Sequence, residues 1–442
     1  MQRKALVIAL VAAGLAAPFA ARATDGYFSH AYGTKALGMG GAGVALAEEP
    51  FGGAVNPATM TMLGNQWQGG ATWFSPKRSA ERTGSGMAGI DGSVSSDSKN
   101  FLVPEFGLNR MLRPDLAVGV SVFGNGGMNT DFEGGQVGAM SACAVFNPTP
   151  GPYNLLCGNG RLGVDLSQLM IAPYAAMKLS PQHSVGIAPV IAYQRFRAQG
   201  LQAFDNPFLS TAPGSVTNRG YDDAWGFGAR LGWAGQFGPV TLAAAYATKV
   251  RMQEFDKYKG LFAEAGGFDI PSNWTIGLAW KPDAKWTIAA DFERINYSDS
   301  KSVSNPATGI LACFGGDANG CLGAGGGAGF GWQDIDVWKV GVQYAIDARW
   351  TVRAGVNRSD NPIQARDVTF NILAPGVIKD HVTAGFTYKL DATSEISGYV
   401  LQARENTVSG TSLLASLGAP PTTAETIRLK ETSIGLAYTA RY

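Results

Sequence analysis

From about residue 65 to the end of the chain, short stretches alternate apolar and polar residues, and this periodicity constrains the fold more than any other feature. Each stretch is about ten residues long, the length of a β-strand that crosses a membrane. Short connections rich in Pro, Gly and Asp alternate with long ones. The short connections are residues 112–116, 179–184, 235–240, 281–286, 346–350 and 390–395, and the long ones lie near 76–98, 128–162, 200–220, 253–272, 299–333, 361–379 and 408–424.

Six short and seven long connections separate fourteen strands. Outer-membrane barrels have this pattern, with an even number of antiparallel strands, short turns on one side and long loops on the other. The stretch WTIGLAW places Trp274, Ile276, Leu278 and Trp280 on one face, with an aromatic residue at each end of the apolar stripe. Alternation also occurs in soluble β-sandwiches, but the strict alternation of connection lengths favours closure in a membrane. We therefore expect an all-β fold, a transmembrane antiparallel β-barrel over residues 65–442.

Residues 1–23 are predicted to be a signal peptide, because Arg3 and Lys4 precede an apolar run and Ala21-Arg22-Ala23 has the small-x-small form of a cleavage site. A membrane anchor is the alternative, which the short apolar run disfavours. Export would place the four cysteines in an oxidising compartment. Proximity in sequence favours disulfides Cys143–Cys157 and Cys313–Cys321. No metal site is expected, because neither pair is accompanied by His or by a C-x-x-C motif.

Residues 24–64 do not alternate and precede the predicted barrel. Within them, GMGGAG places Gly38, Gly40 and Gly43 in the spacing G-x-G-x-x-G of dinucleotide-binding sites. Such a site needs a preceding strand, a βαβ unit and an acidic residue about 20 positions further on, and these are missing from the pattern. We therefore expect no nucleotide and no other cofactor. The segment is predicted to be a plug containing a short helix over residues 37–50, in which Gly38, Gly40, Gly41 and Gly43 let the backbone turn and pack closely.

Residues 24–60 resemble the N-terminal hatch of the FadL/TodX-type outer-membrane transporters of long-chain fatty acids and other hydrophobic compounds. The resemblance rests on the run from Gly38 to Ala45 and on the triplet Asn56-Pro57-Ala58. It implies a passive, monomeric channel that captures a ligand on outer loops and passes it to a lumen pocket. It also implies a hatch that moves when ligand binds, and lateral release at a kink in the third strand.

The third predicted strand begins at Leu116 and is interrupted by Gly124, Asn125, Gly126 and Gly127. Glycines inside a strand mark a bulge or weakened pairing, which fits the lateral opening that the resemblance implies. Alternatively, the strand ends there and enters its loop.

Alternation directs a set of charged side chains into the lumen: Arg230, Lys249, Arg251, Asp291, Glu293, Lys339, Arg353 and Lys389. These side chains either brace the barrel as a salt-bridge network or leave one cation, Lys339, Arg353 or Arg230, to meet a ligand carboxylate. Burying an acyl chain contributes ~0.8 kcal/mol per methylene, more in sum than an exposed ion pair at ~0–1 kcal/mol. The ligand site should therefore be mainly apolar. Candidates in the long loops, which could instead pack the loops together, are Phe204, Phe208, Leu209, Leu261, Phe262 and Phe268.

The predicted function is passive uptake of long-chain fatty acids or related hydrophobic compounds across the bacterial outer membrane. A general porin for hydrophilic solutes is the alternative, which the segment before the barrel disfavours. An outer-membrane lipid hydrolase using His381 is a third hypothesis, but the chain has three histidines and no G-x-S-x-G motif, so no catalytic residue is predicted. The net charge of +1 gives no argument for nucleic acid. Expected partners are a hydrophobic ligand and membrane lipid, and the pattern does not separate fatty acids from alkanes or aromatic hydrocarbons.

Overall fold

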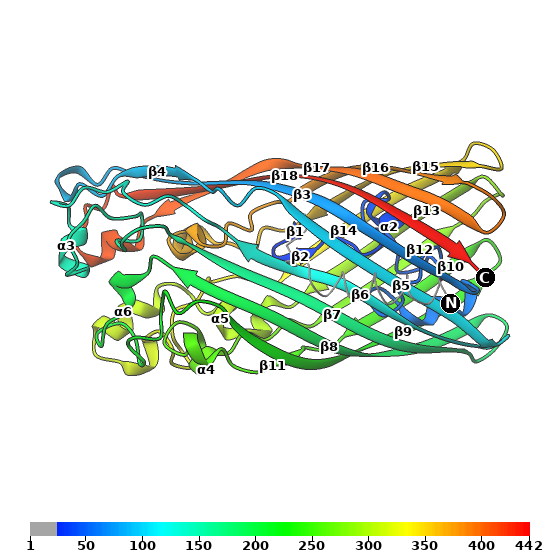
Figure 1. The fold of residues 1–442 in the computed structure, drawn as a ribbon, viewed down its shortest axis with the longest axis horizontal. Coiled ribbons are helices and arrows are strands. Elements are labelled where there is room, and N and C mark those ends of the chain that lie inside the picture. The colour runs from blue at the N-terminus through cyan, green and yellow to red at the C-terminus, as the bar shows by residue number, and fades with distance from the viewer. Residues whose placement is uncertain (1–23) are drawn as a thin grey trace, which may run out of the picture.

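The computed structural model describes residues 24–442, so the predicted signal peptide lies outside the described residues. Fourteen strands form the wall: β3 (Gln66–Thr83), β5 (Phe101–Arg113), β6 (Leu116–Asn129), β7 (Gly163–Lys178), β8 (His183–Gln199), β9 (Asp222–Phe237), β10 (Val240–Ala247), β12 (Asn273–Trp280), β13 (Trp286–Ile295), β14 (Ile335–Ala345), β15 (Trp350–Ser359), β16 (Asp380–Lys389), β17 (Ser394–Thr411) and β18 (Ala424–Arg441). Each pairs antiparallel with its neighbours, and β18 pairs with β3, which closes the barrel (Figure 1). The predicted strand number and fold class are confirmed.

The remaining elements lie in the lumen or in the long loops. Those of the N-terminal segment (residues 24–64) are β1 (Thr24–Asp25), β2 (Phe28–Ser29), α2 (Thr34–Leu37) and η1 (Pro57–Met62). Those of the loops are η2 (Gly86–Ala88), β4 (Gly92–Ser95), α3 (Cys143–Phe146), η3 (Gln202–Phe204), β11 (Arg251–Met252), η4 (Asp256–Tyr258), α4 (Ala263–Gly266), η5 (Tyr297–Asp299), α5 (Lys301–Ser304), α6 (Gly309–Phe314), η6 (Ala318–Gly320), η7 (Ala365–Asp367), η8 (Phe370–Ile372) and η9 (Leu413–Leu417). Among the described residues, no helix is long and apolar enough to cross a membrane.

The apolar face of each strand points away from the lumen, as the alternation predicts. In β12, Ile276 and Leu278 are 50% and 40% exposed, whereas Thr275 and Ala279 are buried. Side chains on this outer face meet lipid instead of water in a membrane-spanning barrel.

Three of the short turns are closed by the same aspartate geometry. The carboxylate of Asp283 accepts the backbone N–H groups of the residues two and three positions further on, and Asp347 and Asp391 do the same in their turns. These are Asx-type turns, which explain why the sequences PDAKW, DARW and DATS connect strands so briefly. Hydrogen bonds from Ser394 and Thr393 lower the pKa of Asp391 to about 2, so the carboxylate stays ionised.

Several strands are longer than the ten residues predicted. Strands β3, β17 and β18 each have 18 residues and remain paired beyond the apolar band. There the outward face becomes polar, as with Glu81 and Arg428, while the inward Ile427 stays buried. The predicted loop limits at 76 and 408 therefore fall inside strands, because a paired strand continues where its outer face changes from lipid to water.

One predicted orientation is wrong. Arg251 is exposed, and Val250 and Met252 are the buried residues of this stretch. Ala247 is buried three positions before Val250, so the two-residue period is broken between them. At the break, the Thr248 side chain accepts the N–H of Ala229 on β9. At the other end of the wall, Lys389 is exposed at the last residue of β16.

The long loops fold back over the mouth of the barrel, and their apolar side chains share one buried core with the wall strands and with residues of the N-terminal segment such as Phe28. The structure joins Cys143 to Cys157 and Cys313 to Cys321 within these loops. A buried ion pair between Arg82 and Glu425, 2.5 Å apart, ties the extended ends of β3 and β18 together beneath them. The loops therefore form a packed cap.

Candidate functional site: an occluded lumen beneath an apolar chamber

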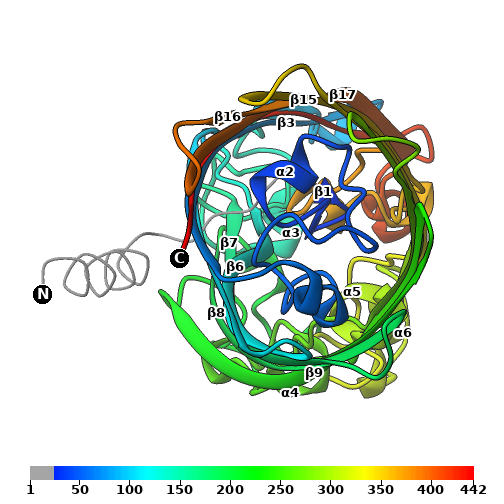
Figure 2. The same ribbon diagram turned by 90° about the vertical axis from the view of Figure 1, so that its right-hand side faces the viewer.

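The N-terminal segment lies inside the barrel, in the half nearer the short turns (Figure 2). Its helix α2 ends at Leu37, so the helix predicted over residues 37–50 is not present. Gly40 and Gly41 follow with φ of 67° and 88°. Residues other than glycine rarely adopt these left-handed angles, so the glycines end the helix and turn the chain.

The wall offers matching glycines where this turn touches it. A Cβ on Gly355 would lie 2.1 Å from the carbonyl carbon of Met39, and one on Gly341 would lie 2.4 Å from the Met39 oxygen. A Cβ on Gly40 would lie 2.6 Å from the backbone of Val356. Neither side has room for a side chain, so backbone packs directly on backbone. Gly355 was not among the predicted site residues, although two glycines at facing inward positions of neighbouring strands, 341 and 355, indicate a close approach of backbone.

Hydrogen bonds from the wall fix the same stretch. One carboxylate oxygen of Asp291 accepts the N–H groups of Gly43 and Val44 at 2.7 and 2.9 Å. The hydroxyl of Thr383 accepts the N–H of Gly40 at 2.8 Å. The G-x-G-x-x-G stretch therefore directs its backbone amides at the barrel's own side chains.

Asn56, Pro57 and Ala58 form the second anchor of the segment. The Asn56 side chain accepts the N–H of Ala58 at 3.0 Å and caps η1. Its amide nitrogen donates to the backbone oxygens of Val44 and Trp233, at 3.0 and 3.1 Å. One side chain thus ties the two halves of the segment to each other and to β9.

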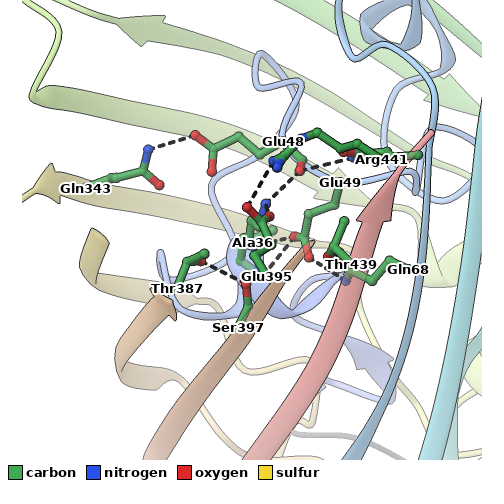
Figure 3. Close-up of polar contacts among 12 residues, drawn as sticks. Ala36, Glu48, Glu49, Gln68, Gln343, Thr387, Glu395, Ser397, Thr439 and Arg441 are labelled. Atoms are coloured by element: carbon green, nitrogen blue, oxygen red, sulfur yellow. Dashed lines mark hydrogen bonds and ion pairs between the residues drawn. The ribbon is translucent and has the colours of Figure 1, made fainter. Parts of the chain in front are cut away.

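A polar network near the short turns completes the attachment (Figure 3). Lys35 lies 2.5 Å from Glu395 of β17, which also pairs with Arg441 at 2.9 Å. Glu49 accepts the N–H groups of Lys35 and Ala36, both at 2.9 Å, and the side-chain amide of Gln68 at 2.7 Å. These buried groups satisfy one another, as polar groups inside a protein must.

The three cations predicted as possible partners of a ligand carboxylate differ in the groups that they contact. Lys339 pairs with Glu293 at 2.6 Å, and Arg353 pairs with Glu48 of the N-terminal segment at 3.2 Å. Arg230 is buried and donates to the backbone oxygen of Val55, but it forms no ion pair within residues 24–442. It lines a small cavity of about 40 Å³ between the segment and the wall, which Tyr32 and Lys339 also line.

The third wall strand, β6, separates from β5 just before the glycines at which an opening was predicted. Its pairing with β5 runs only as far as Val122, whereas its pairing with β7 continues to Asn129. The β6–β7 register shifts between Gly124 and Gly126, so Asn125 is an extra residue. All seven residues from Phe123 to Asn129 are buried, although the residues before them alternate. The strand therefore continues inward instead of ending in its loop.

The N-terminal segment meets β6 at this kink. Phe28 of β2 pairs with Gly126, where a Cβ would lie 1.7 Å from the Tyr27 oxygen. The hydroxyl of Tyr32 donates to the Asn125 side chain at 2.8 Å. Where β6 is not paired with β5, the N-terminal segment thus holds β6 from inside the barrel.

An apolar chamber lies above the segment, among the long loops. The chamber has a free volume of only about 40 Å³, and its lining, which includes five phenylalanines, is Val164, Phe196, Leu201, Phe204, Leu261, Phe262, Ser302, Leu322, Ala328, Gly329, Phe330, Phe370 and Leu373. No charged side chain is among these residues. A mainly aromatic and aliphatic lining of this kind is typical of small-molecule sites.

The chamber takes in only part of the predicted capture residues. Phe204, Leu261 and Phe262 line it, whereas Phe208 is 78% exposed. Leu209 is buried outside the lining, and Phe268 packs behind Phe262 with ring centroids 4.9 Å apart.

A chain of aromatic contacts leads from the chamber to the kink. Phe268 lies 6.3 Å from Tyr27, and Tyr27 lies 5.2 Å from Phe28, measured between ring centroids. Phe28 is the residue that pairs with β6 at Gly126. The chamber lining therefore contacts the N-terminal segment through these rings, and the segment in turn contacts the kinked strand β6.

His381, the residue of the hydrolase hypothesis, is enclosed in the lumen. Its ring stacks on His30 with centroids 5.3 Å apart, and its Nδ1 lies 3.3 Å from the Asn357 side chain. These contacts do not join it to a serine nucleophile.

An outward apolar band, a lumen occupied by the chain's own N-terminal segment and an apolar chamber at the mouth define a transmembrane β-barrel with an occluded interior. The profile of the family described as outer membrane protein transport protein (OMPP1/FadL/TodX) matches residues 158–442. The chain belongs to this family, whose members are transport channels of the bacterial outer membrane. The short turns therefore face the periplasm and the long loops face outward.

Solved structures show the same fold. The chain is similar to the Pseudomonas putida toluene transporter TodX (16% identity, TM-score 0.66, 93% of this chain and 99% of that one). It is similar to the Ralstonia pickettii toluene transporter TbuX (16%, 0.61, 93% and 99%) and to a Pseudomonas aeruginosa FadL homologue (14%, 0.63, 94% and 99%). No curated protein matches the chain.

Proposed function

We propose that this protein carries hydrophobic small molecules passively through the outer membrane and releases them sideways through its wall. The observation that carries the proposal is the loss of β5–β6 pairing above Val122, where β6 is held instead by the N-terminal segment. A lateral exit suits an apolar molecule, because it reaches lipid without crossing the polar network near the periplasmic turns.

In the proposed sequence of events, a ligand enters the apolar chamber and displaces side chains around Phe262 and Phe268. The aromatic contacts with Tyr27 and Phe28 transmit that displacement to β2 and the kink. The N-terminal segment thereby acts as a hatch. A porin-type aqueous path is disfavoured, because the segment occupies the lumen at Gly355, Asp291 and Glu395.

Deletion of the gene is expected to slow uptake of labelled hydrophobic compounds by intact cells. The measurement uses a long-chain fatty acid, an alkane and an aromatic hydrocarbon. Unchanged uptake of all three would refute the proposal, and the compound most affected would define the substrate.

Leu261→Asp is expected to weaken capture about tenfold or more, because a carboxylate at the chamber lining removes apolar contact worth ~1.5–3 kcal/mol. The measurement is equilibrium binding of a labelled aromatic hydrocarbon to purified protein. Phe208→Asp is the matched control, since this loop residue is already exposed to water. Equal losses in both variants would show that capture does not occur in the chamber.

Arg230→Gln is expected to lower uptake of a fatty acid about ten- to hundredfold and to leave a neutral hydrocarbon unaffected, because a hydrogen bond to a charged group contributes ~1.5–3 kcal/mol. The reason is that, of the three candidate partners of a ligand carboxylate, Arg230 is the one without an ion pair among residues 24–442. The measurement compares initial uptake rates of the two compounds. Equal reduction of both would assign Arg230 to holding the Val55 carbonyl instead.

A further inference from the structure

The outward face of the barrel carries charged residues at the outer end of its apolar band, and several lie opposite a residue of the other charge on the neighbouring strand. Arg294 lies directly across from Asp336 on the neighbouring strand, with an N–O distance of 2.7 Å. Arg358 lies across from Asp380, and Arg195 across from Asp223. Opposite charges in directly facing positions stabilise neighbouring strands.

The junction of β3, β18 and β17 departs from this rule. Lys77 and Lys430 are direct cross-strand partners, and both are exposed. Arg404 is exposed at a register shift of β17, beside Lys430. Within residues 24–442, these three basic residues, called the basic row below, form no ion pair. The exposed Glu405 next to Arg404 forms none either.

Like charges in facing positions repel each other, so the basic row is unfavourable unless an anion lies against it. The ion pair of this sector, between Arg428 and Glu81, lies further toward the loops and leaves the row uncompensated.

The height of the basic row places it at the outer lipid headgroups. Lys77 is eleven residues from the periplasmic end of β3 at Gln66, and Lys430 is eleven residues from that of β18 at Arg441. At ~3.4 Å per residue and a tilt of ~40°, eleven residues rise about 28 Å, slightly more than the ~25 Å apolar band.

An apolar surface lies directly below the row, on the same three strands. Trp73 faces Ile434, and Ile434 faces Val400, in the registers of β3–β18 and β18–β17. These side chains are 41%, 46% and 46% exposed. The sector therefore offers cations at headgroup level above a surface suited to acyl chains.

We propose that the basic row binds a phosphate group of a phosphorylated outer-leaflet glycolipid whose acyl chains lie on Trp73, Ile434 and Val400. A phosphate monoester carries more than one negative charge and accepts several hydrogen bonds, so one group can neutralise Lys77 and Lys430 together. The lipid fits better than a soluble anion, because only a lipid occupies both the cations and the apolar surface beneath them.

The test measures binding of diphosphoryl lipid A and of its dephosphorylated form to the full chain in detergent, by native mass spectrometry. The wild type should prefer the phosphorylated lipid, and the double variant Lys77→Gln/Lys430→Gln should lose that preference, with about tenfold weaker binding. The matched control, Lys281→Gln/Lys285→Gln, removes two exposed lysines at the periplasmic end and should bind as the wild type does. Unfolding by heat, followed by electrophoretic mobility, verifies that the variants are folded.

Three results would overturn the proposal. They are equal binding by wild type and double variant, an equal loss in the control, and wild-type binding of the dephosphorylated lipid as tightly as the phosphorylated one. The last would assign binding to the acyl chains alone. Uptake of hydrophobic substrates should be unchanged in the double variant, so this site and the transport proposal are tested separately.

Discussion

Deletion of Asn125 is expected to reduce uptake of hydrophobic substrates at least about tenfold, which corresponds to a barrier raised by ~1.4 kcal/mol or more. Asn125 is the extra residue at the β6–β7 register shift, and removing it lets β6 continue in register along the wall. The upper part of β6 can then pair with β5 above Val122 and close the sideways path. Ligand binding in the loop chamber should persist, because the chamber lining lies elsewhere in the chain. The measurements are initial uptake by cells and equilibrium binding to purified protein.

Two further variants separate the kink from other effects. Deletion of Glu405 removes the extra residue at the register shift between Ala403 and Asn406, on the β17–β18 part of the wall, and should leave uptake unchanged. Asn125→Ala keeps the extra residue but removes the hydrogen bond from Tyr32. If Asn125→Ala alone abolishes uptake, the Tyr32 contact matters more than the opening. Normal uptake after deletion of Asn125 would exclude lateral release at this strand.

The sequence predicts the wall well because its signal is local. Alternating apolar and polar residues show which side chains of a strand face outward and which face the lumen, as with Ile276 and Thr275. Membrane lipid requires an apolar outer face wherever a strand crosses the membrane. The prediction fails where that requirement ends. Beyond the apolar band the outward face is polar, so the outer half of β18 around Arg428 has the composition of a loop although it remains paired. A break in the two-residue period, such as the one before Arg251, also reverses every later assignment in its strand.

The site is less predictable because its contacts join distant parts of the chain. Alternation places Lys339 and Arg353 in the lumen, but it does not reveal that Glu48 comes from the N-terminal segment to neutralise Arg353. The glycines around Asn125 predict a bulge, yet the pairing of Gly126 with Phe28 depends on how the segment folds inside the barrel. Exposed and buried loop phenylalanines, such as Phe208 and Phe204, have no periodicity to distinguish them. These contacts and burials depend on how distant parts of the chain pack together, and no local sequence pattern indicates them.

Gly355→Val is expected to displace the N-terminal segment and raise the permeability of the barrel to small hydrophilic solutes at least about tenfold, since fourteen strands enclose a wider interior than the eight-stranded barrels that side chains alone fill. The substitution places a branched side chain where a Cβ alone would lie 2.1 Å from the Met39 carbonyl carbon and 2.2 Å from the Gly40 nitrogen. Both neighbours are backbone atoms, so no rotamer change relieves the clash, and the segment must leave this part of the wall. The wall itself should still close, because valine is favoured in strands and its backbone pairing with Gly341 is unaffected. Single-channel conductance in planar bilayers measures the effect directly.

Gly69→Val supplies the matched control for this change. Gly69 is also a wall glycine, but it faces outward, and a Cβ there would meet only a Trp67 ring atom at 3.8 Å. The control should therefore conduct as little as the wild type, whereas Gly355→Val should show steady currents. A folded Gly355→Val barrel that stays closed would mean that Met39 and Gly40 do not hold the segment in place, and the anchors at Asp291 and Glu395 would then be sufficient. The backbone contact between GMGGAG and the wall is thus tested apart from the hydrogen bonds around it.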